Sequence, residues 1–535
     1  MRQAPTFRPE IGLVARAPAH GAREARARKT RGLERLLTGD VAVAALLGAA
    51  ALALYVKTAA PGVYSFDAAE FTIASATWGI PHASGYPLFV LLGRLFITLL
   101  PAGDPAFRMV LATALFAALT VTVLYALLRE LELGRMPSLL ASAAFGVSYY
   151  QWASAVVTKE HSLHTLLLGL VLWLLLRWQR RGGFGWLAAA SFAYGLSLAN
   201  HLSAALYGPA ILGFVLAGKR QGATRWLALG GAGALGLLPY IYLPLAYLAQ
   251  PAFNIAGQYD SSGTFHPVDL ASLQGMLWML TARQFGGAMF GSPLQALPGQ
   301  MWELAQWWWG NFFGVGVAVG LLGLKAFHDR NRRFFWMAGA VAALHAAFFV
   351  SYAVTDRYNM FVPVYLMWTG PLAFGIERLQ GMAGSPARAR VAQACLAAGV
   401  MAGAAANYSL VDLSGDRRPG EWARDLLERV PPNATVMARW AFSGPLRYEQ
   451  LIEGVRPDVQ VIDTFLISRA DARRLVEENV DRKALVVDDV TLFQPEELPG
   501  ICGLELSGSR IDLTVSAARA PLAGAHLGYR LVRCP

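Results

Sequence analysis

The chain has 535 residues, of which 55% are hydrophobic and 15% are charged, and its formal net charge is +11. This composition, with a mean hydropathy of +0.40, excludes an ordinary soluble enzyme and indicates a polytopic membrane protein. Residues 408–535 hold 16 basic and 19 acidic side chains, so the positive excess lies in the first 407 residues. Because this positive charge lies in the loops between apolar segments, it indicates the topology of the chain in a membrane and does not indicate a nucleic-acid partner.

Residues 1–38 contain nine basic side chains and three glutamates. We expect a disordered tail that the positive-inside rule keeps in the cytoplasm. An arginine-rich stretch with few acids is also typical of transit peptides, but no cleavage-like site precedes the first apolar segment.

The region 39–407 is expected to be an all-α polytopic membrane domain of about eleven transmembrane helices. The expected spans are 41–57, 107–128, 136–157, 162–178, 185–203, 204–218, 226–249, 302–324, 334–352, 358–376 and 391–407. The apolar run 86–100 is short and contains Arg94, so we interpret it as an interfacial or re-entrant helix.

Charge parity supports this topology. With a cytoplasmic N-terminus, five loops that hold 15 basic residues fall on the cytoplasmic side: 129–135, 177–181, 219–225, 325–333 and 378–390. A further span at 86–100 would invert these loops and violate the positive-inside rule.

The same topology gathers polar residues on the outer face. The first outer loop, 58–106, contains Asp67, Glu70 and His82, and other outer junctions carry Lys159, Glu160, His161, Asn200, His201, Arg283, Asp356 and Arg357. Taken singly, these are helix caps, core histidines or surface ion pairs. Their convergence on one face is what a site at a membrane interface would produce.

Residues 408–535 are expected to form a soluble, extracytoplasmic α/β domain, because helical and strand periodicities alternate there. Helices are predicted at 422–430, 444–452 and 470–479, and strands at 435–440, 459–462 and 484–487. Cys502 and Cys534 are either a disulfide or two free thiols. The domain is expected to recognise the acceptor, to form a lid, or to be a structural appendage.

Two segments resemble a known family. Residues 66–71 (FDAAEF) and 79–88 (GIPHASGYPL) are similar to paired elements of the DUF2723 membrane proteins, which include the transmembrane protein 260-type O-mannosyltransferases. Further stretches fit the same pattern, and the resemblance spans most of residues 40–470: 157–163, 195–201, 240–245, 281–285 and 356–363. Two dipeptides depart from the pattern, at 68–69 and 83–84, which leaves the details of acceptor recognition open.

The resemblance implies a GT-C-like fold and a glycosyltransferase that moves a sugar, in this family mannose, from a polyprenyl-phosphate donor to an extracytoplasmic hydroxyl with inversion. The acceptor is a protein, a lipid or a glycan, with a protein favoured. Asp67 is assigned as general base, and Glu70 as the residue that orients the acceptor or shares this role. The expected location is the inner membrane of a bacterium, with the site and the C-terminal domain on the periplasmic side.

The remaining roles follow from charge and position. The expected ligands of the donor phosphate are Arg357, Arg283, His201 and His82, and acceptor or supporting roles go to Glu160, His161, Asp356, Tyr86 and Asn200. No familiar metal-ligand spacing is present, so no cofactor is expected; a divalent cation bridging Asp67 and Glu70 is the alternative. The competing function is a transporter or lipid flippase; a polysaccharide polymerase and a non-catalytic scaffold are further alternatives.

Overall fold

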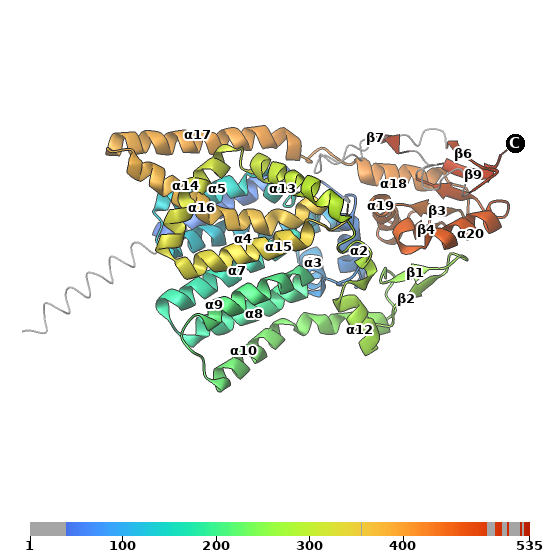
Figure 1. The fold of residues 1–535 in the computed structure, drawn as a ribbon. Coiled ribbons are helices and arrows are strands. Elements are labelled where there is room, and N and C mark those ends of the chain that lie inside the picture. Colours follow the sequence, from blue (N-terminus) through green and yellow to red (C-terminus); the bar gives the residue numbers. More distant parts are fainter. Residues whose placement is uncertain are drawn as a thin grey trace, which may run out of the picture.

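A computed structural model describes residues 39–354, 356–488, 498–505, 511–512, 525–526 and 529–534. The tail predicted at 1–38 therefore lies outside the described residues. Figure 1 shows a bundle of helices at one end and an α/β domain at the other, with α2 (Asp67–Thr77), α12 (Leu273–Leu280) and the hairpin of β1 (Gly257–Tyr259) and β2 (Phe265–Pro267) between them.

Long apolar helices build the bundle. Its elements are Gly39–Lys57, α4 (Pro105–Glu130), α5 (Arg135–Gly146), α6 (Tyr149–Ala153), α7 (Glu160–Arg181), α8 (Phe184–Asn200), η1 (Leu202–Tyr207), α9 (Gly208–Leu216), α10 (Ala223–Gly236), η2 (Leu238–Ile241), α11 (Tyr242–Leu248), η3 (Arg283–Phe285), η4 (Leu294–Ala296), α13 (Leu297–Asn311), α14 (Val315–Arg330), α15 (Arg332–Phe349), η5 (Arg357–Phe361), α16 (Val362–Met382) and α17 (Pro386–Val411).

The fold is mostly helical, as predicted. The number of helices that are individually long and apolar enough to cross a membrane is smaller than the predicted eleven. Among the described residues there are four, namely Gly39–Lys57, α4, α7 and α17, and six if two bent pairs each count as one span. The bent pairs are α10 with Leu238–Leu248, at 45°, and Leu294–Asn311 with α14, at 97°. Most other expected spans are helical but interrupted: 136–157, for example, is divided between α5 and α6.

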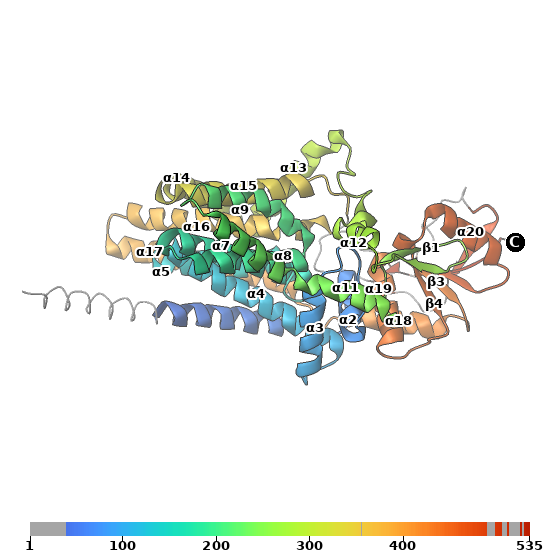
Figure 2. The same ribbon diagram turned by 90° about the horizontal axis from the view of Figure 1, so that it is seen from below.

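The short apolar segment near residue 90 differs from these helices. It forms α3 (Pro87–Leu99), which has 13 residues. Figure 2 shows that α3 runs crosswise to the long helices at the end of the bundle that faces the α/β domain. The chain then turns into α4, whose first turn is capped by Asp104: its carboxylate accepts a hydrogen bond from the Phe107 amide at 2.7 Å.

The C-terminal part is the predicted α/β domain. Its five-stranded sheet has the order β4-β3-β5-β9-β6, in which β4, β3 and β5 are parallel and β9 is antiparallel to both of its neighbours. The strands are β3 (Thr435–Ala438), β4 (Gln460–Asp463), β5 (Leu485–Val487), β6 (Ile501–Glu505) and β9 (Tyr529–Arg533), and the helices are α18 (Arg418–Arg429), α19 (Trp440–Leu451), η6 (Thr464–Leu466) and α20 (Arg469–Asn479). A separate ladder joins β7 (Ile511–Asp512) to β8 (Ala525–His526).

The cysteine alternatives are decided by the structure. Cys502 in β6 and Cys534 just after β9 form a disulfide, with an S–S distance of 2.09 Å. Cys395 in α17 is a free, exposed cysteine.

The two parts of the molecule share a hydrophobic core. Tyr448 and Leu466 of the α/β domain pack with Ala69 and Ile73 of α2 and with Leu243 of α11. The sheet also has its own buried clusters on its two faces. The α/β domain is therefore fixed against α2 and α11.

Candidate active site

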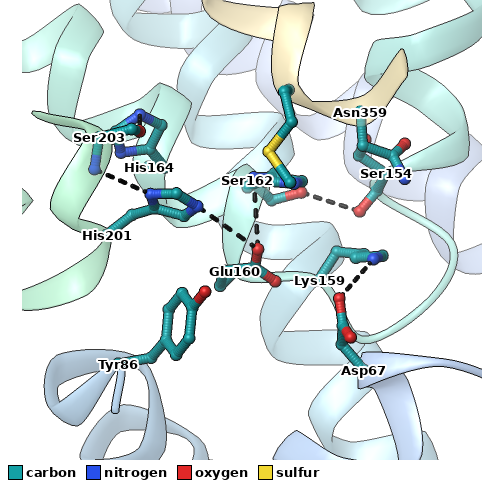
Figure 3. A network of polar contacts seen from close by, with 12 residues as sticks. Asp67, Tyr86, Ser154, Lys159, Glu160, Ser162, His164, His201, Ser203 and Asn359 are labelled. Carbon is teal, nitrogen blue, oxygen red and sulfur yellow. Dashed lines mark hydrogen bonds and ion pairs between the residues drawn. The ribbon is translucent and has the colours of Figure 1, made fainter. Parts of the chain in front are cut away.

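A buried lysine joins two acidic segments that lie far apart in the sequence. The Lys159 ammonium donates to Asp67 Oδ2 at 2.9 Å and to Asp356 Oδ2 at 3.1 Å. Asp67 begins α2, Lys159 immediately precedes α7, and Asp356 immediately precedes η5, so three chain segments meet at this ammonium. Figure 3 shows the contact of Lys159 with Asp67. Asp356 also accepts from the Asn359 amide at 3.4 Å.

The second oxygen of Asp67 is bound by the α/β domain. The Trp440 indole N–H donates to Asp67 Oδ1 at 2.9 Å. Burial alone would raise the pKa of a carboxyl group, but the positive charges of Lys159 and His82 and these hydrogen bonds hold the pKa of Asp67 well below its ordinary value. Asp67 is therefore an ionised carboxylate at neutral pH.

Glu70 and His82 form a buried ion pair on the adjacent turn. Glu70 Oε1 accepts from both the backbone amide and Nδ1 of His82, each at 2.7 Å, while His82 Nε2 lies 2.9 Å from the Tyr86 hydroxyl. Burial lowers the pKa of His82, but the negative charge of Glu70 outweighs it and raises that pKa to about 9. Burial also raises the pKa of Glu70, and the charge of His82 opposes this rise. His82 is thus cationic at neutral pH.

A second acidic group lies at the start of α7. Glu160 Oε1 is 3.4 Å from His161 Nδ1 and 3.9 Å from His201 Nε2, and all three side chains are buried. Within the part of the chain that the structure describes, Glu160 Oε2 and His161 Nε2 have no hydrogen-bond partner. The Asn200 amide donates to the backbone oxygen of Glu160 at 3.3 Å, so Asn200 connects the end of α8 to the start of α7.

These groups surround a cavity of about 550 Å³, which we call the site cavity. Its polar lining includes Asp67, His82, Glu160, His201 and Asp356. Its apolar lining comes from η1, the end of α15 and nearby turns: Leu202, Ala205, Leu206, Met289, Phe348, Phe349, Val354 and Met360. Charged groups and a long apolar surface in one cavity suit a ligand with a polar head and a hydrocarbon chain.

The structure brings most of the predicted site residues together. Asp67, His82, Tyr86, Glu160, His201 and Asp356 line the site cavity, whereas Glu70, His161 and Asn200 contact lining residues from behind. Glu70 therefore acts on the cavity through His82.

The two predicted arginine ligands do not line the site cavity. Arg357 donates to the backbone oxygen of Val350 at 2.8 Å, pairs with Glu303 and stacks on Trp307, with its Cζ 5.5 Å from the ring centroid. Arg283 is exposed. The sequence places both arginines at the same end of the bundle as Asp67 but gives no means of separating the cavity wall from its surroundings. The predicted phosphate ligands that do line the cavity are His82 and His201.

Three important residues had no role in the sequence-based site. Lys159 was recognised only as an outer-face cation, although a lysine beside Glu160 on a face with few cations was an available signal. Trp440 and Phe465 also line the site cavity. They come from the C-terminal domain, and no sequence pattern links them to Asp67.

Among the described residues, two groups of side chains have donor atoms close enough to share a metal ion. They are Glu160 with His161 and His201, and Asp67 with Glu70 and His82; within each group the ligand atoms lie within 4.8 Å of one another. In the second group Asp67 already pairs with Lys159, and Glu70 already pairs with His82.

The fold defines a class of protein. The chain resembles the crystal structure of ArnT from Cupriavidus metallidurans bound to undecaprenyl phosphate, with a TM-score of 0.56 and 16% identity over 91% of this chain and 97% of that one. It also resembles the oligosaccharyltransferase of Archaeoglobus fulgidus, in a complex with zinc and sulfate, with a TM-score of 0.51 and 14% identity over 83% and 68% of the two chains. The chain thus has a GT-C-like fold.

Sequence comparison finds a family model and an individual protein that are similar to the chain. Residues 67–224 match the family model "Protein O-mannosyl-transferase TMEM260 N-terminal domain". The chain is 28% identical over 461 residues to the Protein O-mannosyl-transferase TMEM260 of mouse (Mus musculus). This match covers 81% of this chain and 63% of the mouse protein. The chain thus spans somewhat less than two thirds of that relative's length. The resemblance to the transmembrane protein 260 type is confirmed.

Proposed function

We propose that the chain is an integral-membrane glycosyltransferase that moves a sugar from a polyprenyl-phosphate donor to an acceptor hydroxyl. The observation that carries this proposal is the ionised Asp67 on the wall of a cavity that also offers a long apolar surface. The mouse relative is named as a protein O-mannosyltransferase, which supports mannose as the sugar and a protein as the acceptor.

The proposed reaction is one in-line displacement. Asp67 takes the proton of the acceptor hydroxyl while the oxygen attacks the anomeric carbon. The bond from that carbon to the phosphate oxygen breaks on the opposite face, the phosphate oxygen keeps the electron pair, and the anomeric configuration inverts. Because the pKa of Asp67 is low, the carboxylate is always available, and proton transfer accompanies bond formation rather than preceding it.

The leaving phosphate needs positive or hydrogen-bonding partners. Cationic His82, which Glu70 holds at 2.7 Å, is the best placed of them, with His201 as the second. The polyprenyl chain would lie along the apolar lining from η1 and α15. Burial of each CH₂ group of such a chain contributes about 0.8 kcal/mol, so a few buried isoprene units supply ample affinity.

We propose that the reaction needs no metal ion. A divalent cation bridging Asp67 and Glu70 would have to displace existing partners, because Asp67 already accepts from the Lys159 ammonium and Glu70 already accepts from His82. If a metal were required, Glu160, His161 and His201 are the residues that would hold it, because two of their polar atoms are buried with no partner among the described residues.

The proposed topology has about eleven spans, with the site and the α/β domain on the periplasmic side of a bacterial inner membrane. The transporter alternative is less well supported, because the cavity that holds Asp67 and Glu160 lies at the end of the bundle next to the α/β domain, whose Trp440 lines it.

The test is sugar release from radiolabelled polyprenyl-phosphate sugars by purified protein, with membrane extract as the acceptor. We expect Asp67→Asn to lower release by about 10²- to 10⁴-fold while the protein stays folded and inserted. Asp269→Asn, which changes an exposed carboxylate away from the cavity, should release sugar at the wild-type rate. EDTA should leave the wild-type rate unchanged. Near-normal release by Asp67→Asn would refute the assignment of the base.

A further inference from the structure

The C-terminal sheet points one edge at the site cavity. In open α/β sheets, functional side chains gather beyond the carboxyl ends of parallel strands. Trp440 follows the end of β3 by two residues, and Phe465 follows the end of β4 by two residues. Both side chains line the site cavity, so the carboxyl edge of this sheet forms part of its wall.

Trp440 makes two different kinds of contact there. Its indole N–H donates to Asp67 Oδ1 at 2.9 Å. Its ring meets other aromatic rings edge-on, with centroid distances of 5.2 Å to His82, 5.1 Å to Phe465 and 6.3 Å to Phe285. The ring contacts are general packing, whereas the N–H contact reaches one atom of the proposed base.

The backbone around Trp440 is held firmly. The Arg439 amide donates to Asp488 Oδ2 at 3.0 Å, and the Phe66 amide donates to the backbone oxygen of Ala441 at 3.3 Å. Gly444 lies directly against α2: a Cβ at this position would be 3.0 Å from the Cβ of Ala69. The start of α19 is therefore fixed to both the sheet and the helix that carries Asp67.

Asp67 is consequently held by two groups from different parts of the chain, Lys159 on one oxygen and Trp440 on the other. A carboxylate has about four acceptor positions, so an acceptor hydroxyl still has room to bind. With only Lys159 in place, the carboxylate could rotate about the bond to its Cβ, and its free oxygen would no longer be fixed toward the cavity.

We propose that Trp440 is a positioning residue for Asp67, and that the C-terminal domain thereby completes the active site. The expected effect on kcat rests on the proposed function. The contact between Trp440 and Asp67 does not depend on that function. We predict that loss of the indole N–H alone impairs the chemical step, even when the ring and the domain are still in place.

The decisive variant is Trp440→Phe, which keeps an aromatic ring and removes the N–H. We expect kcat for sugar release to fall about 10- to 100-fold, the loss typical of one hydrogen bond to a charged group, with the donor KM changed less than about twofold. The matched control is Trp302→Phe on α13, the same change at a side chain that is 67% exposed, and its kinetics should equal those of the wild type. An unchanged kcat in Trp440→Phe would overturn the proposal.

A second measurement does not depend on activity. The unfolding temperatures of wild type, Asp67→Asn, Trp440→Phe and the double variant form a double-mutant cycle. Non-additive shifts in unfolding temperature support the Asp67–Trp440 contact, whether or not the protein releases sugar from any donor. If the shifts are non-additive and no donor releases sugar, only the proposed function fails. Additive shifts would refute the contact and the proposal with it.

Discussion

At the scale of single residues, the site depends on a buried ammonium group. Lys159 is 6% exposed and lies against two carboxylates, which raises its pKa well above the ordinary value despite the effect of burial. Buried charges are tolerated only when they are paired, and removal of one partner from such a group costs about 3–5 kcal/mol.

We therefore predict that Lys159→Met lowers the free energy of unfolding by about 3–5 kcal/mol and abolishes sugar release, because Asp67 and Asp356 lose their shared counter-charge. Thermal unfolding in detergent and the release assay measure the two effects. Lys159→Arg, which keeps the charge, should retain most of the stability. If Lys159→Met were as stable as wild type, the ammonium would not be what holds the two carboxylates together.

The residues differ in how far the sequence could identify them. Asp67 and His82 were found because they belong to recognisable segments, and Glu160 and His201 because topology put them on the outer face. Trp440 could not be found, since it is 373 residues from the side chain it binds. A contact across such a separation is created by the docking of two domains and leaves no local pattern.

At the scale of elements, close packing of the helices limits what the bundle tolerates. Helices α14 and α16 cross at glycines, and a Cβ built on Gly375 would lie 1.9 Å from the backbone oxygen of Val319. Small residues at such crossings allow backbones to approach closely, which is a common way for membrane helices to associate.

Gly375→Ala should therefore destabilise the bundle by about 1–3 kcal/mol, the usual cost of overpacking, although alanine is the better helix former. The matched control is Gly339→Ala on α15, where no atom of the described residues beyond the helix's own backbone lies within 4 Å of the added Cβ, and stability there should stay the same or rise slightly. Thermal unfolding of both variants provides the comparison. Equal unfolding temperatures would mean that α14 and α16 do not pack this closely.

Prediction of elements succeeded where periodicity is unambiguous. The helices and strands predicted in the C-terminal domain each have a counterpart in the structure, and most of their ends lie within a few residues: the strand predicted at 459–462 is β4 (Gln460–Asp463). The membrane domain was harder, because hydropathy reports apolar length and does not report where a helix breaks. The break between α10 and α11, for example, is a 3₁₀ turn that contains Pro239.

At the scale of the whole molecule, the structure gathers basic loops at the end of the bundle that lies away from the site. Three of the basic loops predicted to be cytoplasmic meet at one end of the bundle: Arg180 of the second loop pairs with Glu132 of the first, and Arg330 of the fourth donates to the backbone oxygen of Glu132. The site cavity and the α/β domain lie at the opposite end (Figure 1). This arrangement is what the positive-inside rule requires of a protein whose site faces outward.

The sidedness can be tested with single cysteines in a Cys395→Ala background, since Cys502 and Cys534 are paired. Gln274→Cys on α12 is next to the α/β domain and exposed, and Gly222→Cys is exposed in the loop before α10. We expect a membrane-impermeant maleimide to label the first variant in right-side-out membranes and the second only after detergent is added. The reverse pattern would put Asp67 on the cytoplasmic side, and an extracytoplasmic acceptor could then not reach the proposed base.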